Sequence, residues 1–164
     1  MLFIYSLLLL SGKSLMQRNP EQLQSFADRI NTGLDNPENS RALVVFNQTD
    51  QSQSGTAVFR ASMSWPLNLP FPPVAVTNGE GNLVPASIGM MSEAPDPKGR
   101  TDWVLLSLAL RFDVADIPPS GWRTYYAAYA EHASPPLENG AENTDLAVAE
   151  TTRHGGDLPP AGNF

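Results

Sequence analysis

The sequence predicts a mainly β protein, with a short N-terminal helical segment followed by an antiparallel β-sandwich. Three observations favour this fold class. A helical pattern of apolar residues ends near residue 34, several later segments have the runs or alternation of strands, and 12 Gly and 15 Pro supply turns between them. We expect a helical segment at residues 1–36. A sandwich domain is expected at 41–130, and a loop-rich tail at 131–164.

The expected helix begins at Asn19-Pro20-Glu21. Asn caps helices, Pro is favoured in the first turn, and Glu complements the helix dipole. One helical face is then shared by Leu23, Phe26, Ala27, Ile30 and Leu34, and Gly33 is a natural stop. This face needs a partner, and Leu2–Met16 is the only candidate before the strands. The sequence therefore predicts a helix pair.

The N-terminal stretch Leu2–Leu10 is apolar except for Ser6. It has about half of the roughly 20 residues that a spanning helix requires, so we expect no membrane span. No positive charge precedes it and no small-x-small cleavage site follows at once, so a buried segment is favoured over a signal peptide. The chain has no Cys, which excludes disulfides but leaves the compartment open.

Strands are expected in seven places, which are Ala42–Phe46, Gly55–Trp65, a short run from Val74, Leu83-Val84, Trp103–Val114, Trp122–Ala130 and Thr144–Glu150. The first is a continuous apolar run, and the second alternates with one apolar face. The turn residues Asn78–Asn82 indicate a hairpin, whereas the four Pro of Pro66–Val74 exclude a central strand. The last expected strand has no later partner in the chain.

The charge balance argues against two classes of partner. The formal net charge is -7, the isoelectric point is near 4.6, and the ten Lys and Arg residues are scattered. Phosphate backbones and anionic lipids bind to clustered positive charge. We therefore expect no nucleic-acid partner.

Few polar residues suggest chemistry. His132 and His154 have no compact metal-ligand spacing and no Gly-x-Ser-x-Gly elbow beside them, so solvated loop residues are expected. Glu138 with Glu142, and Asp96 with Asp102, are interpreted as acidic surface rather than acid/base pairs. The Gly-x-Gly of Asn78–Gly81 is explained by a hairpin turn without a phosphate.

Two further features allow a functional interpretation. Aromatic faces suit sugar rings, so a stacking platform could be drawn from Trp65, Trp103, Trp122, Tyr125, Tyr126 and Tyr129. Packing in the core of a small sandwich is the favoured interpretation for most of them. Asn47-Gln48-Thr49 is a formal N-glycosylation sequon, which matters only in a secretory compartment.

Three segments resemble glycoside hydrolase family 38, the retaining α-mannosidases, where a helical bundle meets the β-sandwich region. They are RALVVFN (41–47), VTNGEGNLVPASI (76–88) and LRFDVADIPPSGWRTYYA (110–127). The phrase that closes the family's first β-unit is matched at Phe112, Val114, Asp116, Ile117, Pro118, Pro119, Gly121, Trp122, Thr124 and Tyr125. Trp122 departs from the usual Tyr, and Gln48–Asp50 departs from the usual pro-leu-ser. A weaker likeness at Glu142–Leu158 extends the resemblance over roughly Leu23 to Leu158.

The resemblance implies a non-catalytic scaffold fragment of an α-mannosidase-like glycoside hydrolase. It also implies that residues 1–36 are the end of a helical bundle and that residues 131–164 start a further β-domain. In the family, the two carboxylates and the zinc held by His and Asp come mainly from a catalytic domain without a counterpart here. No catalytic, cofactor-binding or metal residue is therefore expected in this chain, which should be inactive alone, and zinc is expected in the full-length enzyme. The expected partner is the missing catalytic domain or carbohydrate. The alternatives are a stand-alone secreted carbohydrate-binding module and a structural sandwich unrelated to sugars.

Overall fold

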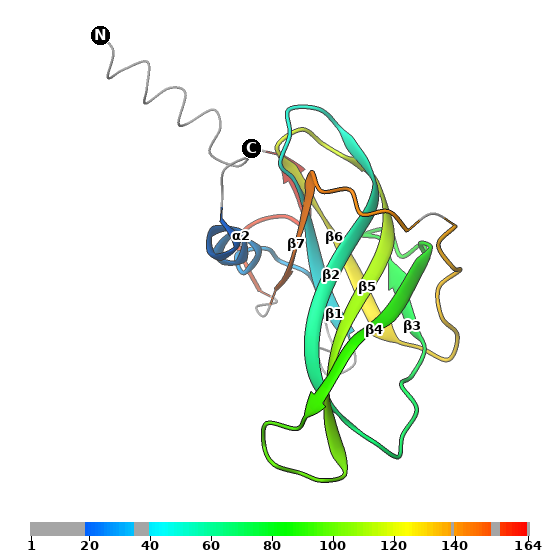
Figure 1. The fold of residues 1–164 in the computed structure, drawn as a ribbon. Helices are drawn as coiled ribbons and strands as arrows, with labels where there is room; N and C mark the ends of the chain where they lie inside the picture. Colours follow the sequence, from blue (N-terminus) through cyan, green and yellow to red (C-terminus); the bar gives the residue numbers. More distant parts are fainter. Residues whose placement is uncertain (1–18, 35–39, 139, 152–154, 164) are drawn as a thin grey trace.

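The protein is described here by a computed structural model covering residues 19–34, 40–138, 140–151 and 155–163. Element labels follow Figure 1. Within these ranges the chain forms α2 (Pro20–Ala27), β1 (Ser40–Asn47), β2 (Gln53–Pro66), β3 (Val74–Thr77), β4 (Ala86–Pro95), β5 (Trp103–Ile117), β6 (Gly121–Tyr129), β7 (Leu146–Thr151) and β8 (Ala161–Asn163). The expected mainly β fold is confirmed. No helix in the described ranges is long and apolar enough to cross a membrane.

The strands form two antiparallel sheets that face one another. The first has the order β3-β6-β1-β7, with β8 also paired to β6, and the second has the order β2-β5-β4. The core between the sheets is built from Leu43, Val45, Ala57, Val76, Ala86, Leu110, Phe112, Val114, Ile117, Tyr125, Ala127 and Leu146. Alternate residues of each strand point into this core, as expected for a sandwich.

Strand β1 is buried on both faces. Leu43 and Val45 point into the core between the sheets. Val44 and Phe46 point the other way and pack under α2, so all four side chains are fully buried. A strand covered on both sides needs apolar residues at every position, which explains the unbroken run from Ala42 to Phe46.

Helix α2 begins with a capping box between Asn19 and Gln22. The Asn19 Oδ1 accepts from the Gln22 amide at 2.9 Å, and the Gln22 Oε1 accepts from the Asn19 amide at 3.1 Å. The helix lies against the outer face of the first sheet, beside β7 (Figure 1). There its apolar face packs against a cluster formed by Val44, Phe46, Trp122 and Ala149. The expected helical partner, Leu2–Met16, lies outside the described residues, and the sheet covers this face of the helix.

The helix ends at Ala27, six positions before the expected stop at Gly33. The backbone beyond it pairs with the tail of the chain. The Asn31 amide donates to the Leu158 carbonyl at 2.8 Å, and the Leu158 amide donates to the Arg29 carbonyl at 2.9 Å. Gly156 passes so close to Arg29 that a Cβ would lie 1.9 Å from its carbonyl oxygen. This pairing replaces the hydrogen bonds that would have continued the helix.

The tail also differs from the expectation of a further β-domain. Strand β7 pairs antiparallel with β1, from Ala42 opposite Thr151 to Asn47 opposite Leu146, and β8 pairs with the start of β6. Both strands therefore complete the first sheet. The sequence pattern shows that residues 144–150 alternate, but it does not reveal that an earlier strand has a free edge.

Strand β4 is shifted relative to its expected position. Leu83 makes only an isolated bridge to Thr77, and the strand starts at Ala86. It then continues through Ser92–Pro95, with a bulge between Met90 and Ser92. The long strand β5 provides the pairing partner that keeps this polar stretch extended.

Candidate functional site

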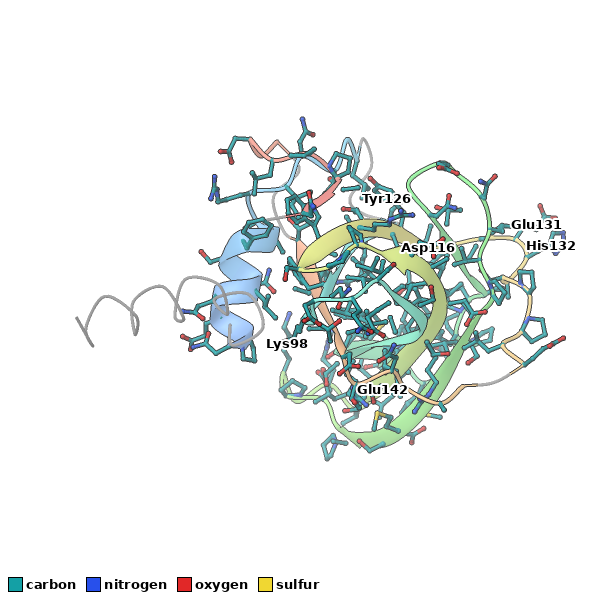
Figure 2. All side chains as sticks on the ribbon, turned by 90° about the horizontal axis from the view of Figure 1, so that it is seen from above. Lys98, Asp116, Tyr126, Glu131, His132 and Glu142 are labelled. Carbon is teal, nitrogen blue, oxygen red and sulfur yellow. The ribbon has the colours of Figure 1, made fainter. Side chains whose placement is uncertain are left out.

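The polar residues that could suggest catalysis are dispersed. His132 is exposed on the segment after β6, and Figure 2 shows it beside Glu131 at the periphery, away from Asp116 and Glu142. His154 lies outside the described residues. Among the described ranges, no group of three or more His, Asp or Glu side chains could hold a metal ion.

Asp96 is an anchor for the segment between β4 and β5. Its buried carboxylate accepts hydrogen bonds from Arg100 Nε at 2.8 Å and Nη2 at 3.0 Å, and from Ser64 Oγ at 2.7 Å. The Arg100 hydrogen bonds, followed by the Ser64 bond, hold the pKa of Asp96 well below its usual range. Asp102 is exposed. Asp96 therefore has a structural role and is not half of an acid/base pair.

Glu142 is also engaged in an ion pair. Its Oε2 lies 2.8 Å from Nη2 of Arg60, and this hydrogen bond lowers the pKa of the carboxyl group. A general acid needs a raised pKa, which requires burial without a positive partner. The paired Glu142 therefore does not have the electrostatics of a general acid.

The turn after β3 uses its amides internally. The Asn78 Oδ1 accepts from the amides of Glu80 and Asn82, both at 3.0 Å. The Asn82 carbonyl accepts in turn from the Asn78 amide at 2.9 Å. The polar stretch Asn78–Gly81 is therefore a side-chain-supported turn, as its residues indicate.

Asn47 closes one end of the sandwich. Its side chain is fully buried, and Nδ2 donates to the carbonyls of Gln51 at 2.6 Å, Ile117 at 3.1 Å and Pro118 at 3.1 Å. Its Oδ1 accepts from the amide of Thr49 at 2.9 Å and from its hydroxyl at 2.8 Å. The side chain joins two of the segments that resemble family 38. Because it is buried and fully bonded, the sequon at Asn47 is not accessible for glycosylation in this fold.

The turn between β5 and β6 completes this end, which we call the closed end and define as Asn47, residues 116–121 and β8. Asp116 and Ser120 have left-handed backbone angles, with φ values of 52° and 46°. Hydrogen bonds hold both, since the Asp116 amide donates to Ser54 Oγ at 2.9 Å and the Ser120 amide to the Thr49 carbonyl at 2.8 Å. Gly121 leaves no room for a side chain, because a Cβ would lie 2.5 Å from the Gly162 carbonyl oxygen.

The six aromatic residues of the sequence analysis do not form one sugar platform. Trp122 and Tyr125 are buried, and Arg100 lies 3.8 Å above the ring of Trp103. Trp65 and Tyr129 pack with Phe71 in tilted and edge-on contacts, with ring centroids 5.0 to 6.2 Å apart. Tyr126 is half-buried and donates to the Thr32 carbonyl at 2.8 Å. The structure thus supports the packing interpretation for these residues.

A small apolar groove lies at the opposite end of the sandwich from Asn47. We call it the open-end groove, and its apolar walls include Leu43, Phe59, Ala61, Met63, Ile88 and Tyr129. The cavity has a volume of about 100 Å³. Its few polar neighbours include Arg41, which forms an ion pair with Glu150 at 2.5 Å. Ligand pockets are usually about 300–1,000 Å³, so this groove suits an apolar side chain better than a sugar chain.

The comparisons with known proteins find likeness only in structure. No family model matches the chain, and no curated protein matches it. A glycosyl hydrolase family 38 protein from Enterococcus faecalis is similar in fold, with a TM-score of 0.51 and 14% identity over 73% of this chain. An α-mannosidase from Enterococcus faecalis V583 gives a TM-score of 0.51 and 13% identity, also over 73%.

The matched region is a small part of those proteins. The chain covers 16% of the first structure and 15% of the second. The resemblance seen in RALVVFN and LRFDVADIPPSGWRTYYA is therefore confirmed at the level of the fold.

Proposed function

We propose that this chain is a non-catalytic scaffold portion of an α-mannosidase-like glycoside hydrolase. The observation that carries the proposal is the shared fold, which spans 73% of this chain but only 15–16% of two family 38 structures. Two of the segments that resemble the family also meet at the closed end, where Asn47 bonds the carbonyls of Ile117 and Pro118.

The electrostatics of the described carboxylates support a scaffold. Retaining glycoside hydrolysis needs one ionised carboxylate and one carboxylic acid with a raised pKa, about 5–5.5 Å apart. Asp96 and Glu142, two of the carboxyl groups considered in the sequence analysis, each lie beside an arginine. Their pKa values are lowered instead. Both are held by arginine in structural ion pairs. Any hydrolysis of α-mannosides then depends on residues outside those described.

An activity assay on the purified chain tests the proposal. We expect no release of p-nitrophenol from p-nitrophenyl α-mannoside, with or without added zinc. Zinc-dependent hydrolysis by this chain alone would overturn the scaffold assignment. Mannose-dependent quenching of tryptophan fluorescence, with no activity, would favour the alternative of a carbohydrate-binding module.

A second test uses the DNA on both sides of the coding sequence. A scaffold predicts that translation of these flanks yields a catalytic domain with His and Asp zinc ligands and a continuation of the β-region. Deleting residues 41–130 from that longer protein should then abolish soluble, active enzyme. Flanks that encode only unrelated proteins would contradict the proposal.

A further inference from the structure

The open-end groove leaves apolar surface in contact with water. At its rim Ile88 is 38% exposed and Tyr129 is 37% exposed, and Met90, next on the same face of β4, is 58% exposed. These side chains project from β4 and β6 on the inner faces of the two sheets, where the sandwich elsewhere is filled by core residues. An apolar hollow of this kind is stabilised when another apolar group covers it.

The start of α2 lies next to this groove. A second hollow between α2, β7 and β2 is lined by Pro20, Leu23 and Gln24 of the helix. Phe59 and Ala61 of β2 line both hollows, so the two share a wall. The helix therefore starts at a hollow that is separated from the groove by the shared wall of Phe59 and Ala61.

The sequence preceding α2 contains an apolar segment that the described residues do not cover. Leu2–Leu10 is apolar except for Ser6, and the eight residues 11–18 connect it to Asn19. Eight extended residues span about 26–29 Å, whereas the sheets of a sandwich are about 10 Å apart, so the segment can reach the groove. The apolar face of α2 is not available to the segment, since it packs on β1, β6 and β7.

We propose that Leu2–Leu10 occupies the open-end groove of its own chain by inserting one apolar side chain. The size of the cavity suits a single apolar side chain, because its volume of about 100 Å³ is somewhat smaller than the about 150 Å³ of an apolar cavity that binds benzene. The connection at Pro20 makes the contact intramolecular, which raises the effective concentration of the segment at the groove. The inference is independent of the proposed scaffold function.

Disulfide trapping tests the proposal directly, because the full chain has no Cys of its own. Leu7→Cys, Leu8→Cys, Leu9→Cys and Leu10→Cys are each combined with Met63→Cys, which lies in the groove. The matched control replaces Met63→Cys by Ser62→Cys, whose exposed side chain points to the outer face of the same strand. With a mild oxidant and dilute protein, at least one Met63 pair should form an intramolecular disulfide 10-fold faster than its Ser62 control.

A second pair of positions controls for a local folding defect caused by the substitution at Met63. Ile88→Cys lies on the other wall of the groove, and its neighbour Ser87→Cys points to the outer face of β4. The same preference for the groove position is expected, with native circular dichroism in every variant. Equal rates at groove and control positions would overturn the proposal. Intermolecular disulfides alone would also overturn it and would indicate that a second copy of the chain occupies the groove. Mass spectrometry showing that the purified chain lacks Leu2–Leu10 would likewise overturn it.

Discussion

The closed and open ends of the sandwich are held together by different interactions. At the closed end Asn47 satisfies three carbonyls and accepts two hydrogen bonds, and Gly121 and Gly162 let β8 approach β6 closely. At the open end the inner faces of the sheets present apolar side chains to solvent around a cavity. Two of the segments that resemble family 38 meet at the closed end, where Asn47 bonds the carbonyls of Ile117 and Pro118. Polar contacts therefore fix the closed end, whereas the open end leaves apolar side chains in contact with water.

The largest effect should come from Phe46→Ala, next to Asn47. Phe46 is fully buried under α2 and makes an edge-on contact with Phe26 at 5.8 Å between ring centroids. We expect the free energy of unfolding to fall by about 4 kcal/mol, since both transfer and cavity terms are lost. Urea denaturation measures the change, and a loss below about 1 kcal/mol would mean that α2 is not docked as described.

The second effect concerns the polar contacts of Asn47 itself. Asn47→Ala leaves buried carbonyls without a donor and should cost about 3 kcal/mol. Gln48→Ala, at the adjacent half-buried position, is the control and should stay within about 0.5 kcal/mol. Similar urea midpoints for the two variants would contradict the closing role assigned to Asn47.

The third effect tests the close approach of β8 to β6. A methyl group at residue 121 meets the Gly162 carbonyl and Pro118, so Gly121→Ala should destabilise the chain by about 2 kcal/mol. Gly89→Ala in β4 meets nothing within 4 Å and serves as the matched control. A lower midpoint of thermal unfolding for Gly121→Ala alone would support the close approach of β8 to β6. A lower midpoint for both variants would contradict it.

The open end should respond weakly to truncation of an exposed side chain. Met91 lies at the bulge of β4 and is 61% exposed. Met91→Ala should change the free energy of unfolding by less than about 0.5 kcal/mol, because little apolar area returns to water. A larger loss in urea denaturation would show that another group covers this part of β4.

A further effect, which depends on pH, is expected at Asp96. Its pKa in the folded chain is lowered by Arg100 and Ser64, so the ionised form favours the folded state. The stabilising contribution is complete above the pKa of an unfolded Asp, about 3.9, and is lost as the pH falls through the folded-state pKa. The difference between the parent and Asp96→Asn should therefore be constant above about pH 5 and shrink in more acidic solution. A constant difference down to pH 2 would contradict this role.

Most of the secondary structure could be predicted because it depends on local patterns. The strands beginning near Ala42, Gly55, Trp103 and Trp122 confirm the expected apolar runs and alternation. The length of α2 could not be predicted, because tail residues near Leu158 compete for its backbone. The placement of β7 beside β1 depends on a long-range pairing that alternation alone does not specify.

The open-end groove and the role of Asn47 also could not be predicted from the sequence. Phe59, Met63 and Tyr129 follow ordinary strand patterns. Only the folded structure shows that they surround a hollow. The sequence alone indicates a sequon or the end of a strand at Asn47. Its hydrogen-bond partners Ile117 and Pro118 are distant in the sequence, so local patterns do not reveal them. The abrupt change from Phe46 to Asn47 was the available signal.

The two-sided burial of β1 has a consequence for biosynthesis. Its neighbours in the sheet, β6 and β7, are made only after it. Until they emerge from the ribosome, five consecutive apolar residues have neither of their sheet partners, and long-range pairing of this kind is slow. A nascent chain stopped before residue 121 should therefore need a chaperone, whereas one extended past residue 151 can bury Ala42–Phe46 within its own fold.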